Sequence, residues 1–170
     1  MPNSQFRSLL LAPIIIFSLP PQLFAQNQIP SISCEIPPQL ELLENPAQLR
    51  NLGIISAYPI ETIENQHPDL WWAKEQFDTF DGNLIINWLI YPEQQQIDLI
   101  VNRQIWTGLT YLDQYRLVNQ FGTVARSYGY DLRVFNQQKF CLAIYNCNFS
   151  TTKPQCEINL KPSNSGSFRL

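Results

Sequence analysis

Leu84–Tyr91 reads LIINWLIY, an almost unbroken apolar run of eight residues. A run of this length predicts a buried strand, although its periodicity alone leaves a helix open. Pro92–Gln95 then predicts a turn. The next stretch alternates apolar and polar side chains, as a strand does, with Ile97, Leu99 and Val101 against Asp98 and Asn102. Together the two runs predict a β-hairpin.

Helices are predicted on both sides of this hairpin. Before it, Pro68–Asp69 marks a helix start, and that helix should end near Phe77. After it, Asn102 can cap a stretch whose apolar residues recur at helical spacing. Arg116 interrupts this apolar stripe, so we expect two helices, or one helix kinked near Tyr115–Leu117. The stripe consists of Ile105, Leu109, Leu112, Leu117, Phe121, Val124, Ala125 and Tyr128.

A second hairpin is predicted after these helices. Gly129 lies where a left-handed C-terminal stop is expected. Two alternating runs follow, Leu132–Phe135 and Phe140–Tyr145, and Asn136–Lys139 connects them as a turn. The order is then one helix, two strands, one or two helices, and two strands. This order predicts an α+β fold with a small, mostly antiparallel sheet packed on helices.

Proline divides the chain into regions. Eight of the 13 prolines lie between residues 20 and 68, and only one lies between residues 69 and 147. We therefore expect an irregular, Pro-rich arm over residues 26–68 and a compact α+β core over residues 69–147. Residues 148–170 are expected to form a C-terminal extension that ends in a polar, flexible tail.

The first 25 residues have the pattern of a secretory signal peptide. Arg7 supplies the basic segment, Ser8–Leu19 the apolar segment, and Ala25 the small residue at the cleavage point before Gln26. The apolar segment has about a dozen residues, fewer than the roughly 20 needed to span a bilayer. We expect an exported protein with no transmembrane segment once the signal is removed. An uncleaved anchoring segment is the alternative.

Four cysteines in an exported chain predict disulfides. If one strand carries both Cys141 and Cys147, their Cα atoms lie roughly 20 Å apart, which is too far for a disulfide. Of the remaining pairings we favour Cys147 with Cys156, which closes a short loop, and Cys34 with Cys141, which ties the arm to the core. The alternative is that one or both pairs stay reduced.

Charge is distributed unevenly along the chain. Residues 26–98 carry a net charge of −9, and residues 99–170 carry +5. This division favours two halves that fold against each other or mix on one surface, and the alternative is that the basic half forms a patch for an anionic partner. A sequence pI of about 5.1 argues against a nucleic acid as the partner. The candidate patch consists of Arg103, Arg116, Arg126, Arg133 and Lys139.

The composition excludes several kinds of metal and catalytic site. His67 is the only histidine, so zinc sites built on two or three histidines are impossible. The cysteines lack the close spacing of a four-cysteine zinc site, and no serine lies in a nucleophile motif. We therefore predict no catalytic histidine, no metal and no cofactor.

Acidic and aromatic residues in residues 70–81 allow two further hypotheses. Glu75, Asp78 and Asp81 follow Trp71–Trp72, so a small hydrolase with paired carboxylates is possible in principle. A solvated helix face is the alternative for these acids. The tryptophans could stack on a saccharide or a peptide, although core packing is their usual role. Because Trp71 and Trp72 point about 100° apart on a helix, one of them cannot be fully buried and is a candidate contact residue.

Five segments between Leu70 and Cys147 resemble a group of small exported cyanobacterial proteins without an assigned function. They are LWWAKEQF, NWLIYP, DLIVNRQIW, FGTVARSYGY and LRVFNQQ. The resemblance implies a periplasmic or thylakoid-lumen setting, while an extracellular location fits the signal pattern equally well. It supplies no functional residues.

The leading functional hypothesis is a non-enzymatic, exported protein-interaction module. Its support is the missing nucleophile and metal signatures, the charge division, the aromatic-rich core and the N-terminal arm. The partner would be a protein or another anionic molecule in the envelope or lumen. A saccharide- or peptide-binding module that uses an exposed tryptophan is the first alternative, and the small hydrolase is the second.

Overall fold

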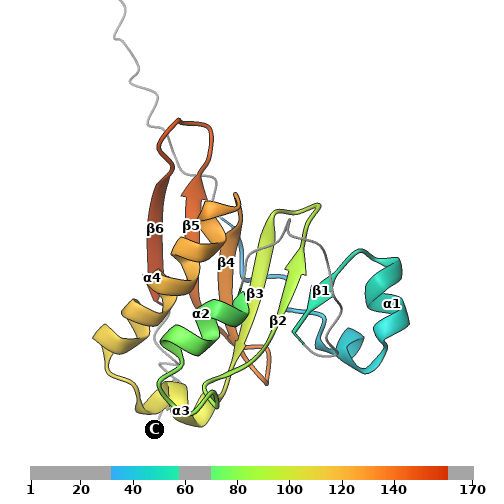
Figure 1. The fold of residues 1–170 in the computed structure, drawn as a ribbon, viewed down its shortest axis with the longest axis horizontal. Coiled ribbons are helices and arrows are strands. Elements are labelled where there is room, and N and C mark those ends of the chain that lie inside the picture. The colour runs from blue at the N-terminus through green and yellow to red at the C-terminus, as the bar shows by residue number, and fades with distance from the viewer. Residues whose placement is uncertain (1–31, 58–69, 161–170) are drawn as a thin grey trace, which may run out of the picture.

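The computed structural model of this chain describes residues 32–57 and 70–160. The expected signal peptide, His67 and the C-terminal tail lie outside these described residues. Within them, the chain forms a six-stranded, mostly antiparallel sheet with helices (Figure 1). The expected α+β class is therefore confirmed.

Eleven elements make up the described part of the chain, and the sheet follows their sequence order, β1-β2-β3-β4-β5-β6. In chain order they are η1 (Leu40–Glu44), α1 (Pro46–Asn51), β1 (Ile55–Ser56), α2 (Leu70–Phe77), β2 (Ile85–Tyr91), β3 (Gln96–Val101), α3 (Arg103–Gly108), α4 (Tyr111–Ser127), β4 (Asp131–Asn136), β5 (Cys141–Asn148) and β6 (Gln155–Leu160).

The two predicted hairpins are present as β2–β3 and β4–β5. Between them, β3 and β4 are parallel, with Gln96 opposite Asp131 and Val101 opposite Asn136. Parallel neighbours need a crossover connection of a dozen residues or more, and α3 with α4 supplies it. Gly129, at φ +81°, ends this crossover where the sequence predicted a left-handed stop.

The helical crossover breaks at a different place from the one expected. Two helices are present, but they separate at Leu109–Thr110 rather than near Tyr115–Leu117. Thr110 begins α4 because its side-chain oxygen accepts the backbone N–H of Asp113 at 3.2 Å. The new start also rotates Leu112 out of the apolar stripe, and its side chain is exposed instead of buried.

One face of the sheet packs against α2, α3 and α4, and this is the main hydrophobic core. Trp88, Leu99 and Val134 point from the strands toward the helices, where Phe121 of α4 is fully buried. α2 adds Trp71, whose ring meets Trp88 edge to face at a centroid distance of 4.9 Å. This core fixes α2 and α4 beside each other on the same face (Figure 1).

The N-terminal segment covers the opposite face of the sheet. Leu42 of η1 and Leu49 of α1 form a second cluster with Leu89 and Tyr91, which alternate with the core-facing residues of β2. In Figure 1 the chain before η1 passes behind the strands, and α1 lies beside β1. The region expected to be an irregular arm thus contains short helices and a strand within residues 32–57.

The sheet also extends beyond the range expected for the core. β6 lies in the segment expected to be a C-terminal extension, and it pairs antiparallel with β5. Its side chains alternate between exposed and half-buried along the strand. Cys156 lies directly opposite Cys147 in this pairing. The predicted disulfide between them therefore joins two paired strands of a hairpin.

Candidate functional site

A groove lies between α2 and α4 on the helical face. Its volume is about 350 Å³, which is within the range that binds a small molecule or a side chain. Five apolar and five polar residues line it, and we call the apolar set its floor, in which Phe80 is 40% exposed, and the polar set its rim. The floor consists of Phe77, Phe80, Leu84, Leu109 and Leu117, and the rim consists of Gln76, Thr79, Asp113, Arg116 and Gln120.

Trp72 lies beside this groove and is 50% exposed. Its ring meets Phe77 edge to face at 5.6 Å, and Phe77 in turn meets the buried Phe121 at 6.2 Å. Trp71 turns the other way and packs on the sheet. The expectation that one of the two adjacent tryptophans stays exposed is therefore confirmed, and the exposed ring is anchored to the core through Phe77.

The first two turns of α4 also carry exposed apolar side chains that do not line the groove. Tyr111, Leu112 and Tyr115 are all exposed, and the same turns supply Asp113 and Arg116 to the rim. Exposed aromatic residues with an arginine are the composition that distinguishes protein interfaces from the rest of a surface. No sequence pattern marked these side chains as exposed, and Leu112 fitted the predicted buried stripe.

The two charged rim residues have different roles. The Asp113 carboxylate accepts the hydroxyl of Thr110 at 2.6 Å and so belongs to the cap of α4. Arg116 approaches Asp113 only at 3.7 Å, and its side chain is 72% exposed. The groove therefore offers a positive charge at its rim that is available to a ligand.

The predicted basic patch is wrong, because its members do not share one face. Arg103 begins α3, whereas Arg126 lies in the last turn of α4, at the other end of the helical layer (Figure 1). Lys139 forms an ion pair with Glu41 of the N-terminal segment, which lowers the pKa of Glu41. Arg133 is buried within the sheet and does not contribute to a surface at all.

Arg133 instead forms a two-point ion pair with Asp98 on the neighbouring strand. Its Nε and Nη2 atoms each lie 2.7 Å from a carboxylate oxygen of Asp98. Burial raises the pKa of Asp98, and the hydrogen bonds from Arg133 act against that rise. Nη1 donates to the carbonyl oxygens of Ser33 and Ile36 at 2.7 and 2.8 Å, so this arginine binds the N-terminal segment to the sheet.

The acidic residues considered for a hydrolase do not form a pair of free carboxylates. Asp78 is buried, and its two oxygens accept backbone N–H groups of Phe80, Leu84 and Ile85 at 2.8–3.3 Å. It therefore shapes the loop between α2 and β2. Glu75 and Asp81 are exposed. Among the described residues, no group of three or more His, Cys, Asp and Glu side chains could hold a metal ion.

Both favoured disulfides are present, Cys34–Cys141 and Cys147–Cys156. The first joins the N-terminal segment to the start of β5, on the side where Arg133 also binds that segment. The second joins β5 to β6. Two disulfides in one small chain indicate an oxidising environment.

Comparisons with protein-family models, curated proteins and solved structures give no match for this chain. The resemblance to exported cyanobacterial proteins therefore stays a prediction. No helix in the described part of the chain has the length and apolarity to cross a bilayer.

Proposed function

We propose that this chain is a non-enzymatic binding module that receives an apolar side chain of a partner protein in the α2–α4 groove. The supporting observation is the groove itself, which has an apolar floor, a polar rim and the half-exposed Trp72 beside it. Binding hot spots are enriched in tryptophan, tyrosine and arginine. Trp72 and Arg116 supply two of these residue types, both largely exposed, at this groove.

The rim charge defines the neighbourhood of the anchoring side chain. Asp113 is engaged in capping α4, whereas Arg116 is largely exposed. A carboxylate on the partner, next to its apolar anchor, would pair with Arg116. The recognised feature is therefore a large apolar residue adjacent to Asp or Glu. This charge complementarity would contribute mainly to specificity and association rate.

The setting that fits this role is outside the cytoplasm. Two disulfides support an oxidising compartment, and the sequence pattern of residues 1–25 supports export. We place the module in a periplasm, a thylakoid lumen or the extracellular space, with an envelope or lumen protein as its partner.

A random peptide library displayed on phage, selected on the full-length chain, tests this function. We expect enriched peptides that share Trp, Phe or Leu next to an acidic residue. Trp72→Ala and Phe80→Ala should each weaken binding of a selected peptide by about tenfold, as loss of an interface hot spot does. Arg116→Gln should weaken it less and should reduce its dependence on salt.

Phe140→Ala is the matched control, because Phe140 is an exposed aromatic residue next to the β4–β5 turn and does not line the groove. It should leave peptide binding unchanged. An equal loss in this variant, or selected peptides with no shared apolar residue, contradicts the proposal. Binding of neutral glycans that needs Trp72, without any selected peptide, would replace it by saccharide binding.

A further inference from the structure

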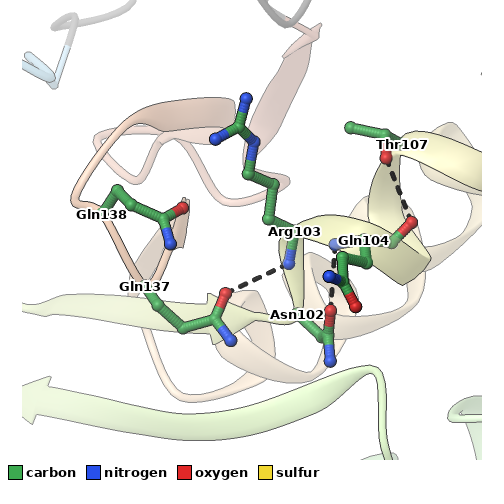
Figure 2. A pocket seen from close by; sticks show the side chains of 6 residues that line it. All are labelled: Asn102, Arg103, Gln104, Thr107, Gln137 and Gln138. Carbon is green, nitrogen blue, oxygen red and sulfur yellow. Dashed lines mark hydrogen bonds between the residues drawn. The ribbon is translucent and has the colours of Figure 1, made fainter.

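A second cavity lies where the parallel strands β3 and β4 end. Val101, the last residue of β3, pairs with Asn136, the last residue of β4. In open α/β sheets, ligands bind outside the carboxyl ends of the parallel strands, and this cavity has the same position relative to the one parallel pair of the described sheet. The cavity measures about 440 Å³ and shares no lining residue with the α2–α4 groove. Figure 2 shows its lining, which consists of Asn102, Arg103, Gln104, Thr107, Gln137 and Gln138.

The walls of this cavity are fixed by side chain to backbone hydrogen bonds. On one wall, the Asn102 side-chain oxygen accepts two backbone N–H groups of α3, at 2.9 and 3.4 Å. On the other wall, the Asn136 side-chain oxygen accepts the N–H of Gln138 at 2.9 Å and so shapes the β4–β5 turn. Gln137 joins the walls, because its side-chain oxygen accepts the N–H of Arg103 at 3.1 Å.

The polar groups that remain in the cavity are suited to a ligand. In Figure 2 the Arg103 side chain stands between the β4–β5 turn and α3, and the Gln138 amide faces its aliphatic stem. Within residues 32–57 and 70–160, the guanidinium of Arg103 has no ion pair, and the side-chain amides of Gln104 and Gln138 have no hydrogen bond. The six lining residues include no carboxylate. The cavity therefore favours an anion over a cation.

We propose that this cavity binds a small hydroxylated carboxylate, such as a sugar acid. A guanidinium presents two parallel N–H groups that match the two oxygens of one carboxylate. The amide of Gln138, which lies on the Arg103 side of the cavity in Figure 2, donates and accepts, so it matches a hydroxyl group, which does the same. One arginine surrounded by neutral amides suits a ligand with a single negative charge. This site is independent of the protein-binding groove.

Isothermal titration calorimetry of the full-length chain with D-glucuronate, D-glucose and acetate tests the proposal. Glucuronate should show saturable binding, while glucose lacks the charge and acetate lacks the hydroxyls, so both should bind at least about tenfold more weakly. Arg103→Gln should weaken glucuronate binding by about tenfold or more. Gln138→Ala should weaken it by a smaller factor.

Arg126→Gln is the matched control, because Arg126 is also an exposed arginine but lies at the far end of α4. It should leave glucuronate binding unchanged, and Arg103→Gln should keep the unfolding curve and any peptide binding of the unsubstituted chain. The proposal is overturned if glucuronate does not bind, if Arg126→Gln loses as much affinity as Arg103→Gln, or if acetate or inorganic phosphate binds as tightly as glucuronate.

Discussion

At Gly122, α4 packs closely against Tyr145 of the sheet. A Cβ atom placed on this glycine would lie 2.3 Å from the ring atoms Cγ and Cδ2 of Tyr145, which is buried on β5. Alanine normally favours a helix over glycine by about 1 kcal/mol. Here the overpacking outweighs that gain, so we expect Gly122→Ala to lower the free energy of unfolding by about 2 kcal/mol. Urea unfolding followed by tryptophan fluorescence measures it.

The control for this substitution is Gly108→Ala at the end of α3. A Cβ there meets no atom within 4 Å, so stability should stay the same or rise slightly. If Gly122→Ala proved as stable as the unsubstituted chain, α4 could not pack on β5 at the spacing described here.

Asp131 makes stability depend on pH. Burial raises the pKa of its carboxyl from 3.8 to about 6, against the opposing effect of the Cys147 N–H that it accepts at 2.7 Å. The folded state therefore holds this proton more tightly than the unfolded state, and its contribution to stability is lost as pH rises from about 4 through about 6. We expect Asp131→Asn to be more stable than the unsubstituted chain at pH 7 by about 1 kcal/mol, a value reduced for solvent screening at this half-buried site.

Chemical denaturation of both proteins between about pH 3.5 and about pH 7.5 measures this difference, because that range includes the pKa of Asp131 in both the unfolded and the folded state. The two stabilities should converge toward the acid end and separate above pH 6. Parallel curves over the whole range would mean that Asp131 titrates as an exposed carboxyl does.

Two charged residues lie inside apolar strands and meet in the interior of the molecule. Asp98 lies in QIDLIV and Arg133 in DLRVFN, each between apolar neighbours. We read Arg133 as part of a surface because an alternating strand has one solvent-facing side. The N-terminal segment covers that side, so the two charges meet in the interior. The alternation was correct, but which second layer covers it depends on contacts distant in sequence.

At the scale of elements, the two disulfides should differ in their effect on stability. Cys34–Cys141 spans 107 residues, and Cys147–Cys156 spans 9. Because closing a longer loop removes more entropy from the unfolded chain, we expect Cys34→Ser with Cys141→Ser to lower stability by about 4–5 kcal/mol. Cys147→Ser with Cys156→Ser should lower it by about 2.5–3 kcal/mol. Urea unfolding of the two double variants under non-reducing conditions measures the order.

The reverse order would also be informative. It would mean that the N-terminal segment stays ordered in the unfolded ensemble, or that β6 depends on its disulfide more than on its strand pairing. A chain with all four cysteines replaced provides the reference in which neither effect remains.

Element positions were predictable where local signals were strong, and not where pairing decided them. The strands β2 to β5 follow directly from apolar runs and alternation, and Gly129 marks the end of α4. The segment QCEINL alternates as well, but it lies in the range 148–170 that we expected to be a C-terminal extension outside the core. The parallel contact of β3 with β4 was also missed, because alternation gives the faces of a strand and not its neighbour.

The whole molecule has three layers, which are the helices, the sheet and the N-terminal segment. The candidate sites depend on how these layers pack, so they were only partly visible in the sequence. The exposure of one tryptophan followed from helix geometry alone. The α2–α4 groove did not, because its floor combines residues of α2, the following loop, the α3–α4 junction and α4, which only tertiary packing brings together. Likewise Arg103 was a candidate by charge, while its cavity depends on the β4–β5 turn lying 34 residues away.

Arg133 links two of these layers, and its substitution separates two effects. Arg133→Met leaves Asp98 buried without its partner, so we expect the free energy of unfolding to fall by about 3–5 kcal/mol. Adding Asp98→Leu removes the unpaired charge and should restore most of that loss, because apolar side chains can replace a buried ion pair at little cost. Urea unfolding of the single and double variants measures this recovery.

The attachment of the N-terminal segment should not recover in the same way. The carbonyl groups of Ser33 and Ile36 lose their donor in both variants. Hydrogen exchange over residues 33–49 should therefore be faster in both variants than in the unsubstituted chain, even with the Cys34–Cys141 disulfide intact. If the double variant restored slow exchange together with stability, the segment would be attached by the disulfide and the Leu42–Leu49 cluster alone, and Arg133 would serve only to neutralise Asp98.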